Sequence, residues 1–270
     1  MNEKIIRVFP RRTKWTPSDA LAFVGDPSLF RPEDFPVKVS VTFTWDIPEA
    51  ERLYKAWKVY YSDVEMGGPA LGDRGGKFSP GLFVEPGRVV TSRGCIRSCA
   101  HCFVPEREGT IRELEIKDGW DVFDNNLLAC SREHVEKVFN MLSKQKKGAV
   151  LSGGLDVRLF NSWHVELLRK IRISDIFFAY DQPGIEEELK RVVDLISWIP
   201  EWKRRCYVLI GYPGDSLSAA EERLRWTYKN GLLPFPMVYR DKSERQVIGR
   251  PWVELRGWWV RPSNYRRKKT

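Results

Sequence analysis

The feature that most constrains the fold is an alternation of strand-like and helix-like segments between residues 88 and 240. Six short apolar segments rich in β-branched and aromatic residues are punctuated by longer segments with a helical spacing of apolar residues. The predicted strands cover residues 88–91, 120–123, 149–152, 176–180, 206–210 and 233–239. This alternation predicts an α/β fold with a parallel sheet and right-handed crossover connections.

The first 80 residues predict a separate, smaller α/β unit. Strand patterns at residues 5–9, 37–43 and 63–66 flank a helix that Pro48 opens, with Leu53 and Trp57 on one face. Residues 69–87 are rich in glycine and proline, which marks a boundary. We therefore expect a small domain over residues 1–80, a larger one over 88–240, and an irregular basic tail over 241–270.

Three of the five cysteines lie in one short loop after the strand at 88–91. Cys95, Cys99 and Cys102 have the spacing Cys-x3-Cys-x2-Cys. Sulfur ligands suit an iron–sulfur cluster or zinc, and three ligands leave one coordination position open. A structural zinc site remains the alternative, with His101 as the nearby fourth ligand, although its adjacency to Cys102 makes tetrahedral ligation awkward.

The remaining cysteines, Cys130 and Cys206, are expected to be buried as small apolar side chains. A second cluster would need more cysteines than the chain contains, so the sequence predicts one cluster at most.

Polar residues follow the other predicted strands. They are Asp124-Asn125-Asn126, Asp156 with Arg158, Asp181, and the loop 211–215. Because parallel α/β barrels place their sites at the carboxyl ends of the strands, these groups are expected to share a pocket with the cysteine loop. For each group a turn, a helix cap or an ion pair is the competing interpretation. The pair Gly153-Gly154 is expected to serve packing.

The cysteine segment resembles that of the radical S-adenosylmethionine (radical SAM) superfamily, in the type that carries an N-terminal cobalamin-binding domain. The resemblance covers roughly residues 1–240. It rests on Gly94-Cys95, Phe103-Val104-Pro105, Glu108-Gly109, Arg112, Asp124-Asn125-Asn126-Leu127, Ile210-Gly211-Tyr212-Pro213-Gly214-Asp215 and Met66-Gly67-Gly68-Pro69-Ala70.

The resemblance implies a partial (βα)6, TIM-like barrel preceded by a small Rossmann-like domain. It also implies a [4Fe–4S] cluster on Cys95, Cys99 and Cys102, with S-adenosylmethionine on the fourth iron and a reductant such as flavodoxin or ferredoxin. The implied chemistry is reductive cleavage to a 5′-deoxyadenosyl radical that takes hydrogen from an unidentified substrate. No catalytic residue is assigned beyond the cluster ligands. The expected cofactor-binding residues are Asp124, Asn125, Asn126, Arg158, Gly211 and Tyr212.

Two departures from the family pattern concern histidines. The Asp-x-His-x-x-Gly segment that ligates cobalamin is absent from residues 1–80, because the chain's histidines are His101, His134 and His164. Bound cobalamin is therefore not expected, and the N-terminal domain is interpreted as degenerate. His101 replaces the usual aromatic residue before the third cysteine, and its ring can still pack near the adenine. His134 and His164 lie on predicted helices and are expected to be solvated.

The charge balance bears on the partner. Lys and Arg total 45 against 36 Asp and Glu, a net charge of +9. The tail carries Trp252, Trp258 and Trp259 and ends in Arg266-Arg267-Lys268-Lys269, a combination that can stack on bases and contact phosphates. Nucleic acid is therefore favoured as the substrate, with a small metabolite or a peptide as alternatives. A disordered tail that only solubilises the chain is the competing interpretation of the basic segment. A rival hypothesis is a non-catalytic iron–sulfur or zinc protein that binds nucleic acid through this tail.

The location is inferred from what the sequence lacks. No segment approaches the roughly 20 apolar residues that span a bilayer, and the first residues do not have the pattern of a signal peptide. An odd number of cysteines with three clustered does not suggest a disulfide framework. The expectation is a cytoplasmic enzyme with no membrane partner.

Overall fold

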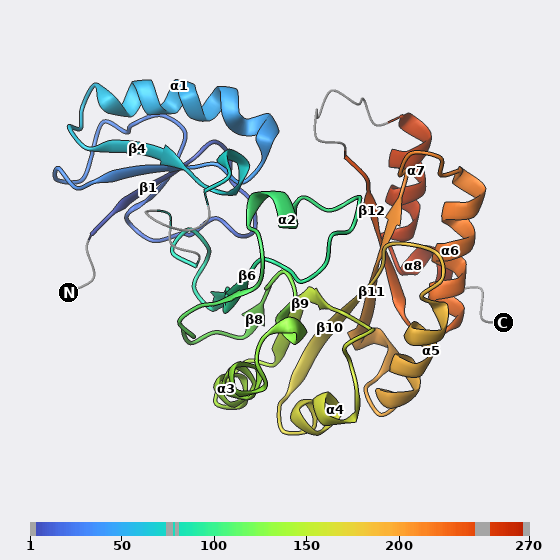
Figure 1. The fold of residues 1–270 in the computed structure, drawn as a ribbon. Coiled ribbons are helices and arrows are strands. Elements are labelled where there is room, and N and C mark those ends of the chain that lie inside the picture. Colours follow the sequence, from blue (N-terminus) through green and yellow to red (C-terminus); the bar gives the residue numbers. More distant parts are fainter. Residues whose placement is uncertain (1–3, 74–77, 79–80, 241–248, 267–270) are drawn as a thin grey trace. The chain divides into compact units, whose positions relative to one another are not determined.

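Two parallel β-sheets form the framework of the molecule in a computed structural model (Figure 1). The structure describes residues 4–73, 78, 81–240 and 249–266. By their internal contacts the residues form two units. Unit 1 is Met1–Arg88 with Val104–Gly109, and unit 2 is Val89–Phe103 with Thr110–Thr270. Both sheets are parallel and both carry helices, so the predicted α/β class is confirmed.

Unit 1 contains a four-stranded parallel sheet in the order β2-β1-β3-β4. The alternating Val residues of the third strand place Val37 and Val39 in the core, as a half-buried strand requires. The strands are β1 (Ile6–Phe9), β2 (Ala22–Val24), β3 (Val37–Ser40) and β4 (Val64–Gly67).

Helix α1 (Ile47–Lys58) covers the unit 1 sheet. Pro48 lies in its first turn, where the missing N–H costs nothing. Ala50, Leu53 and Trp57 recur at helical spacing and are fully buried. The Trp57 indole Nε1 donates a hydrogen bond to the Gly25 carbonyl oxygen (3.0 Å), which fixes the helix to the loop after β2.

Unit 2 contains a six-stranded sheet in the order β12-β11-β10-β9-β8-β5, and the strands from β8 to β12 pair in parallel. Each successive strand joins the same edge, so neighbours in sequence are neighbours in space. A separate antiparallel pair, β6 and β7, brackets the cysteine loop. The strands are β5 (Arg88–Val89), β6 (Ser92–Arg93), β7 (Arg112–Glu113), β8 (Asp121–Val122), β9 (Ala149–Leu155), β10 (Ile173–Tyr180), β11 (Arg204–Ile210) and β12 (Leu233–Val238).

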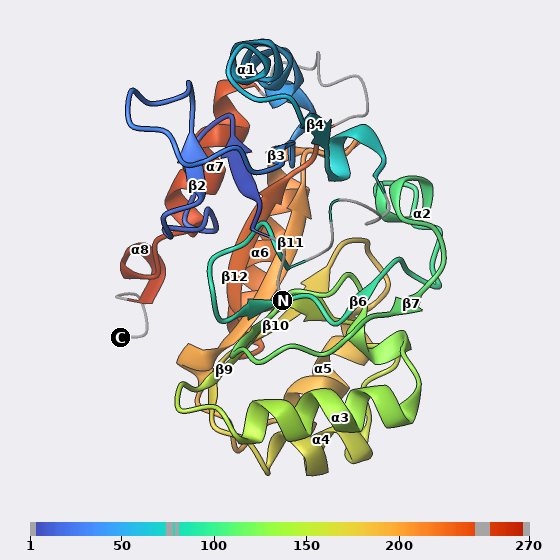
Figure 2. The ribbon, with the colours of Figure 1, turned by 90° about the vertical axis from the view of Figure 1, so that its left-hand side faces the viewer.

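The helices of unit 2 follow its strands and bury one face of the sheet. Along β10, Ile176 and Phe178 belong to the same core cluster as Leu189 and Val192 of the next helix. Helices α3 and α4 lie side by side (Figures 1 and 2). The helices of unit 2 are α3 (Arg132–Ser143), α4 (Ser162–Leu168), α5 (Glu186–Leu195), α6 (Leu217–Lys229), α7 (Arg250–Trp259) and α8 (Ser263–Arg266). The short helix α2 (Val104–Arg107) belongs to unit 1. Short 3-10 turns are η1 (Thr44–Asp46), η2 (Pro69–Leu71), η3 (Leu127–Ala129) and η4 (Glu201–Lys203). Among the helices of the described residues, none has the length and apolar character to cross a bilayer.

Strand β9 is longer than the predicted segment 149–152, because it continues through Gly153 and Gly154 to Leu155. The expected packing role of Gly153 is confirmed. A Cβ atom there would lie 2.1 Å from the carbonyl oxygen of Asp124, so only glycine lets these two backbones approach. Gly154 has φ +85°, and the pairing with β10 shifts register at this point. The two glycines together make a bulge that sets the end of β9.

The prediction of an irregular tail is wrong for much of its described part. Helix α7 begins after Gly249 with Pro251 in its first turn, and α8 follows. Trp259 is 2% exposed, and its ring lies 4.9 Å from that of Tyr265, which is also buried. Burial of two large aromatic side chains stabilises these helices against unit 2. Residues 241–248 and 267–270, which include most of the basic run, lie outside the described residues.

Two further expectations are wrong in whole or in part. Trp252 and Trp259 pack on the unit 2 core, so of the three tryptophans in the tail prediction only Trp258, which is 38% exposed, remains open for stacking. His134 and His164 were expected to be solvated, and both are buried. His164 lies between aromatic neighbours, and its Nδ1 accepts a hydrogen bond from the Asn161 backbone N–H (3.2 Å) in a capping box at the start of α4.

Candidate functional site

A cavity of about 150 Å³ in unit 2 holds all three clustered cysteines in its wall. It lies where the ends of β8, β9 and β10 meet the cysteine loop, because residues after each of these strands line it. The lining residues are Cys95, Arg97, Cys99, His101, Cys102, Asn125, Asn126, Gly153, Gly154, Leu155, Asp156, Val157, Arg158, Ala179, Asp181, Gln182 and Ile185.

The cysteine loop begins at Gly94, whose φ of +84° only glycine adopts readily. The backbone N–H of Cys102 donates to the Cys99 carbonyl oxygen (3.0 Å), which forms a tight turn between two of the cysteines. The three thiols are half-buried. In the part of the chain that the structure describes, no three His, Cys, Asp or Glu side chains converge closely enough to hold one ion. The thiols thus share a cavity without meeting at a point.

Asp156 connects the end of β9 to the cysteine loop. Its side chain is 6% exposed, and it accepts from Arg97 Nε at 2.5 Å and from Arg158 Nε at 2.9 Å. Asn126 Nδ2 donates to the same carboxylate (3.4 Å) and to Cys95 Sγ (3.5 Å). The Arg97 backbone N–H also points at Cys95 Sγ (3.4 Å). One carboxylate therefore organises two guanidinium groups and an amide around the first cysteine.

The electrostatics of this network favour its charged forms. Burial raises the pKa of Asp156, but hydrogen bonds from Arg158 and Arg97 outweigh burial and leave that pKa below its usual value. Burial lowers the pKa of Arg158, but interactions with Asp156 and, to a smaller extent, with Cys99 outweigh burial and leave that pKa above its usual value. The two guanidinium groups and the single carboxylate give this part of the wall a positive balance, which suits an anionic ligand group.

Asn126 presents an acceptor that lacks a partner. Its side-chain Oδ1 is buried and has no hydrogen bond within the described residues, although its Nδ2 is fully engaged. A buried carbonyl without a donor costs free energy, so it is suited to a ligand that brings an N–H group. The neighbouring Asn125 is held differently, since its Oδ1 accepts from Arg93 Nη1 at 2.9 Å.

Asp124 was predicted as a cofactor-binding residue, and the structure gives it an internal role instead. It is buried outside the cavity lining. Its carboxylate accepts from the Thr91 backbone N–H (2.6 Å), the Thr91 hydroxyl and the Ser92 hydroxyl (2.8 Å). Burial raises the pKa of Asp124, with these hydrogen bonds acting in the opposite direction. Asp124 thus ties the end of β8 to the segment that leads into the cysteine loop.

Gly211 and Tyr212 do not line the cavity. Gly211 has φ +74°, its N–H donates to Asp215 Oδ2 (2.9 Å), and a Cβ there would lie 3.3 Å from the Trp252 ring. The Tyr212 ring meets that of His101 edge-on, with centroids 6.3 Å apart. His101 Nε2 also lies 3.7 Å from Asp181 Oδ2. Tyr212 therefore borders the site through His101.

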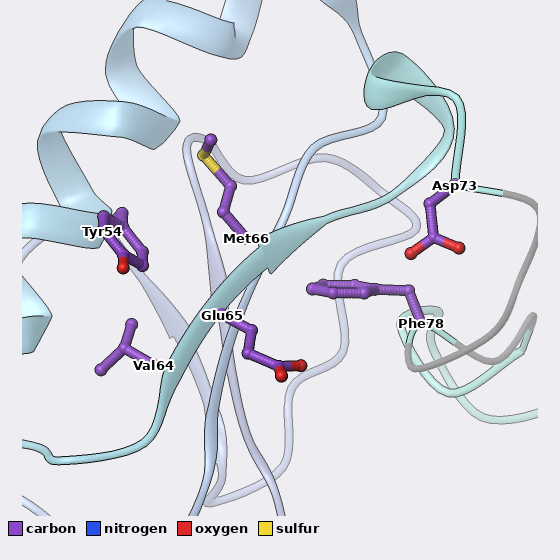
Figure 3. A pocket seen from close by; sticks show the side chains of 6 residues that line it. All are labelled: Tyr54, Val64, Glu65, Met66, Asp73 and Phe78. Carbon is purple, nitrogen blue, oxygen red and sulfur yellow. The ribbon is translucent and has the colours of Figure 1, made fainter.

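Unit 1 has a larger hollow of about 530 Å³ with a different character (Figure 3). Tyr54 of α1, three successive residues of β4, Asp73 and Phe78 line it. Glu65 in its wall is paired with Lys38 (3.8 Å), and the Phe78 ring occupies the space beside Gly67. It contains no cysteine and none of the predicted site residues, so the cysteine cavity is the better candidate.

The cavity brings together six of the nine predicted site residues. They are Cys95, Cys99, Cys102, Asn125, Asn126 and Arg158. Sequence reasoning missed Arg97 and gave Asp156 no firm role. The available signal was Arg97's position between two clustered cysteines, opposite an acid that follows a strand.

Comparison with protein-family models and with curated proteins found no match for this chain. A function must therefore be inferred from the cysteine cavity and the residues that surround it.

Proposed function

We propose that this chain is a radical SAM enzyme whose active site is the cysteine cavity. The observation that carries the proposal is that Cys95, Cys99 and Cys102 line one cavity together with polar groups from the ends of three parallel strands. Ligand sites at the carboxyl ends of parallel strands are the rule in α/β folds. The sequence resemblance to radical SAM enzymes supports the same assignment.

The strand order supports a partial (βα)6 barrel for unit 2. The strands β5, β8, β9, β10, β11 and β12 follow one another around the sheet without a reversal. An open doubly wound sheet instead reverses its strand order at a switch point. The cysteine loop follows the first strand, as the resemblance implies. The four-stranded parallel sheet of unit 1 is interpreted as the degenerate Rossmann-like domain.

The donor set fits an iron–sulfur cluster. Cys95, Cys99 and Cys102 would hold a [4Fe–4S] cluster, since thiolates are its usual ligands. When bound and reduced by a flavodoxin or ferredoxin, the cluster supplies the electron that cleaves S-adenosylmethionine and starts hydrogen abstraction from the substrate. The N–H groups of Arg97 and Asn126 that point at Cys95 Sγ would stabilise its thiolate form.

The remaining lining residues would bind the amino-acid end of S-adenosylmethionine. Asn126 Oδ1 is an acceptor for the ammonium group, because it is buried and without a donor in the described structure. Arg158 and Arg97 would orient the carboxylate, and Asp156 would hold both guanidinium groups in place. Asp124 would not touch the ligand; it would hold Thr91 and Ser92, in the segment that leads into the cysteine loop.

Anaerobic reconstitution with iron and sulfide tests the cluster, with iron and sulfide analysis and absorbance at about 400 nm as readouts. We expect close to four irons per chain for the intact protein and a large loss in Cys99→Ala. Cys130→Ala is the matched control, because it also removes one thiol but lies outside the cavity. Cys130→Ala should load like the parent.

Binding of S-adenosylmethionine to the loaded protein tests the second half of the proposal by equilibrium dialysis. Arg158→Gln should weaken binding about tenfold by removing a charge-assisted contact. Retention of zinc instead of iron, or equal iron loading in Cys99→Ala, would show that the cavity is not a cluster site.

A further inference from the structure

The amino end of the unit 2 sheet carries a surface that the proposed enzymatic site does not use. The loops that enter β9, β10 and β11 span residues 144–148, 169–172 and 198–203. With Trp120, which precedes β8, they form what we call the amino-end surface. These three loops contain seven Lys or Arg residues and a single Asp or Glu.

Side-chain contacts between neighbouring loops make this surface continuous. Arg172 Nη2 donates to the Gln145 carbonyl oxygen at 2.7 Å, and Lys203 Nζ donates to the Ile173 carbonyl oxygen at 2.5 Å. Arg169 lies over the Trp198 ring at 4.6 Å. Because adjacent strands are about 4.8 Å apart, the entrances of four strands extend over roughly 15 Å, which is enough for several nucleotides.

Cations and indole rings are interleaved here. Trp198 is 37% exposed and Trp202 is 56% exposed. Lys147 lies 3.8 Å from the centre of the Trp120 ring, and Lys203 lies 4.9 Å from that of Trp202. Exposed indoles beside Lys and Arg can stack on unpaired bases while the cations contact the phosphates. The acids of the surface and its edge are Glu201 in the third loop, Asp118, which accepts from Gln145 Nε2 (3.3 Å), and Asp194 at the end of α5.

We propose that the amino-end surface binds single-stranded nucleic acid. Charge complementarity favours a polyanion, and the exposed indoles favour one with accessible bases. A lipid surface is disfavoured, because Ile171 and Ile199 within these loops are buried and leave no aliphatic side chain to insert. The surface lies at the opposite strand ends from the cysteine cavity, so it serves to anchor a nucleic acid rather than to present the reacting atom.

Fluorescence anisotropy of the full chain with a labelled oligothymidylate tests this proposal. The triple variant Lys146→Gln, Lys147→Gln, Lys170→Gln removes three exposed cations from the surface. We expect affinity to fall about tenfold and the slope of log affinity against log salt to fall by about 2, since each phosphate contact on a single strand contributes about 0.7.

The matched control is Lys137→Gln, Lys190→Gln, Arg225→Gln, which removes the same charge from exposed positions on α3, α5 and α6. It should leave affinity within about twofold, because these cations lie outside the surface. A second variant isolates the stacking contribution. Trp202→Ala should weaken oligothymidylate about fivefold or more and leave an abasic oligomer of equal length unaffected.

Several results would overturn the proposal. They are no saturable binding of oligothymidylate, equal losses in the two triple variants, or binding that disappears only when residues 261–270 are deleted. Binding to phosphatidylserine vesicles in place of the oligonucleotide would assign the surface to a membrane instead. The measurement needs no iron, so its outcome is independent of the proposed enzymatic activity.

Discussion

The two ends of the six-stranded sheet in unit 2 differ in how their polar side chains are held. At the carboxyl end, Asp156 is nearly buried and binds Arg97 and Arg158, and Asp124 is buried among hydroxyl and N–H donors. At the amino end, Lys146, Lys147 and their neighbours are exposed. One end is an interlocked set of hydrogen bonds, and the other is an open cationic surface.

This difference indicates two ways of recognising a ligand. A buried network fixes each side chain before the ligand arrives, so it suits a small cofactor that must be placed accurately. An exposed cationic surface stays adaptable and attracts a polymer through its summed charge. Substitutions at the carboxyl end should therefore cost folding stability, whereas those at the amino end should mainly change binding.

The largest effect is expected at the packed backbone of the carboxyl end. Gly153→Ala would place a Cβ 2.1 Å from the Asp124 carbonyl oxygen and 2.8 Å from its nitrogen. We expect a loss of at least about 3 kcal/mol in the free energy of unfolding, because the clash can be relieved only by moving one of the two backbone segments. Gly154→Ala meets only the Tyr207 ring at 3.6 Å and should cost about 1–2 kcal/mol from its positive φ. Urea unfolding measures both, and equal losses would contradict the close-approach explanation.

Acid should destabilise unit 2 through His164. Burial lowers the pKa of His164 to about 4 in the folded chain, against its usual value of 6.5. The imidazole is therefore neutral when folded and protonated when unfolded between these values, so stability is lost as the pH falls from about 6.5 to 4. The loss from this group should be about 3 kcal/mol.

His164→Gln is the matched variant, because glutamine at the third helical position keeps the capping box. Urea unfolding at pH 7 and pH 4 should show a smaller acid-induced loss in His164→Gln than in the parent. An identical pH dependence in both proteins would mean that the folded chain protonates His164 freely.

The buried and exposed carboxylates of the same sheet should respond differently to removal. Asp156→Ala leaves two guanidinium groups without their partner in the cavity and should cost about 2–3 kcal/mol. Asp175 forms a more exposed pair with Arg205, so Asp175→Ala should cost less than about 1 kcal/mol. Thermal and urea unfolding decide the order. A larger cost at Asp175 would contradict the view that the Asp156 network organises the site.

The smallest effect is expected at the amino end. Lys147→Ala removes a cation from the face of Trp120 and should cost about 0.5 kcal/mol, as an exposed cation–π pair does. Lys146→Ala removes an exposed cation and should be neutral within about 0.5 kcal/mol. Losses comparable to that of Asp156→Ala would remove the distinction between the two ends.

Much of the framework could be predicted from local patterns. The parallel α/β class follows from the alternating apolar segments, because the spacing of apolar residues that distinguishes a strand from a helix can be read within a short stretch of sequence. The start of α3 is another local pattern, because Ser131 stands directly before the helical segment and its side chain accepts from the His134 N–H (3.2 Å). The burial of Cys206 is likewise as predicted, whereas Cys130, for which the same was expected, is only half-buried.

The site network could not be predicted in the same way. Arg97 and Asp156 are 59 residues apart, so their contact depends on the register of β9 and on the bulge at Gly154. The C-terminal helices were missed because the tail was judged by its many basic residues. Trp252, Leu255 and Trp259 are nevertheless spaced as on one face of a helix, and all three pack on the core. Asp124 was misassigned because a carboxylate at a strand end is equally suited to bind a ligand or a neighbouring segment.

The most direct test of the central claim is the cleavage of S-adenosylmethionine by the cluster-loaded chain. Dithionite is added anaerobically, and 5′-deoxyadenosine is quantified by liquid chromatography. We predict its formation by the parent and by Cys130→Ala, and its absence in Cys99→Ala. A fully iron-loaded parent that forms no 5′-deoxyadenosine, or a Cys99→Ala variant that forms as much as the parent, would contradict the assignment of the cysteine cavity as a radical SAM site.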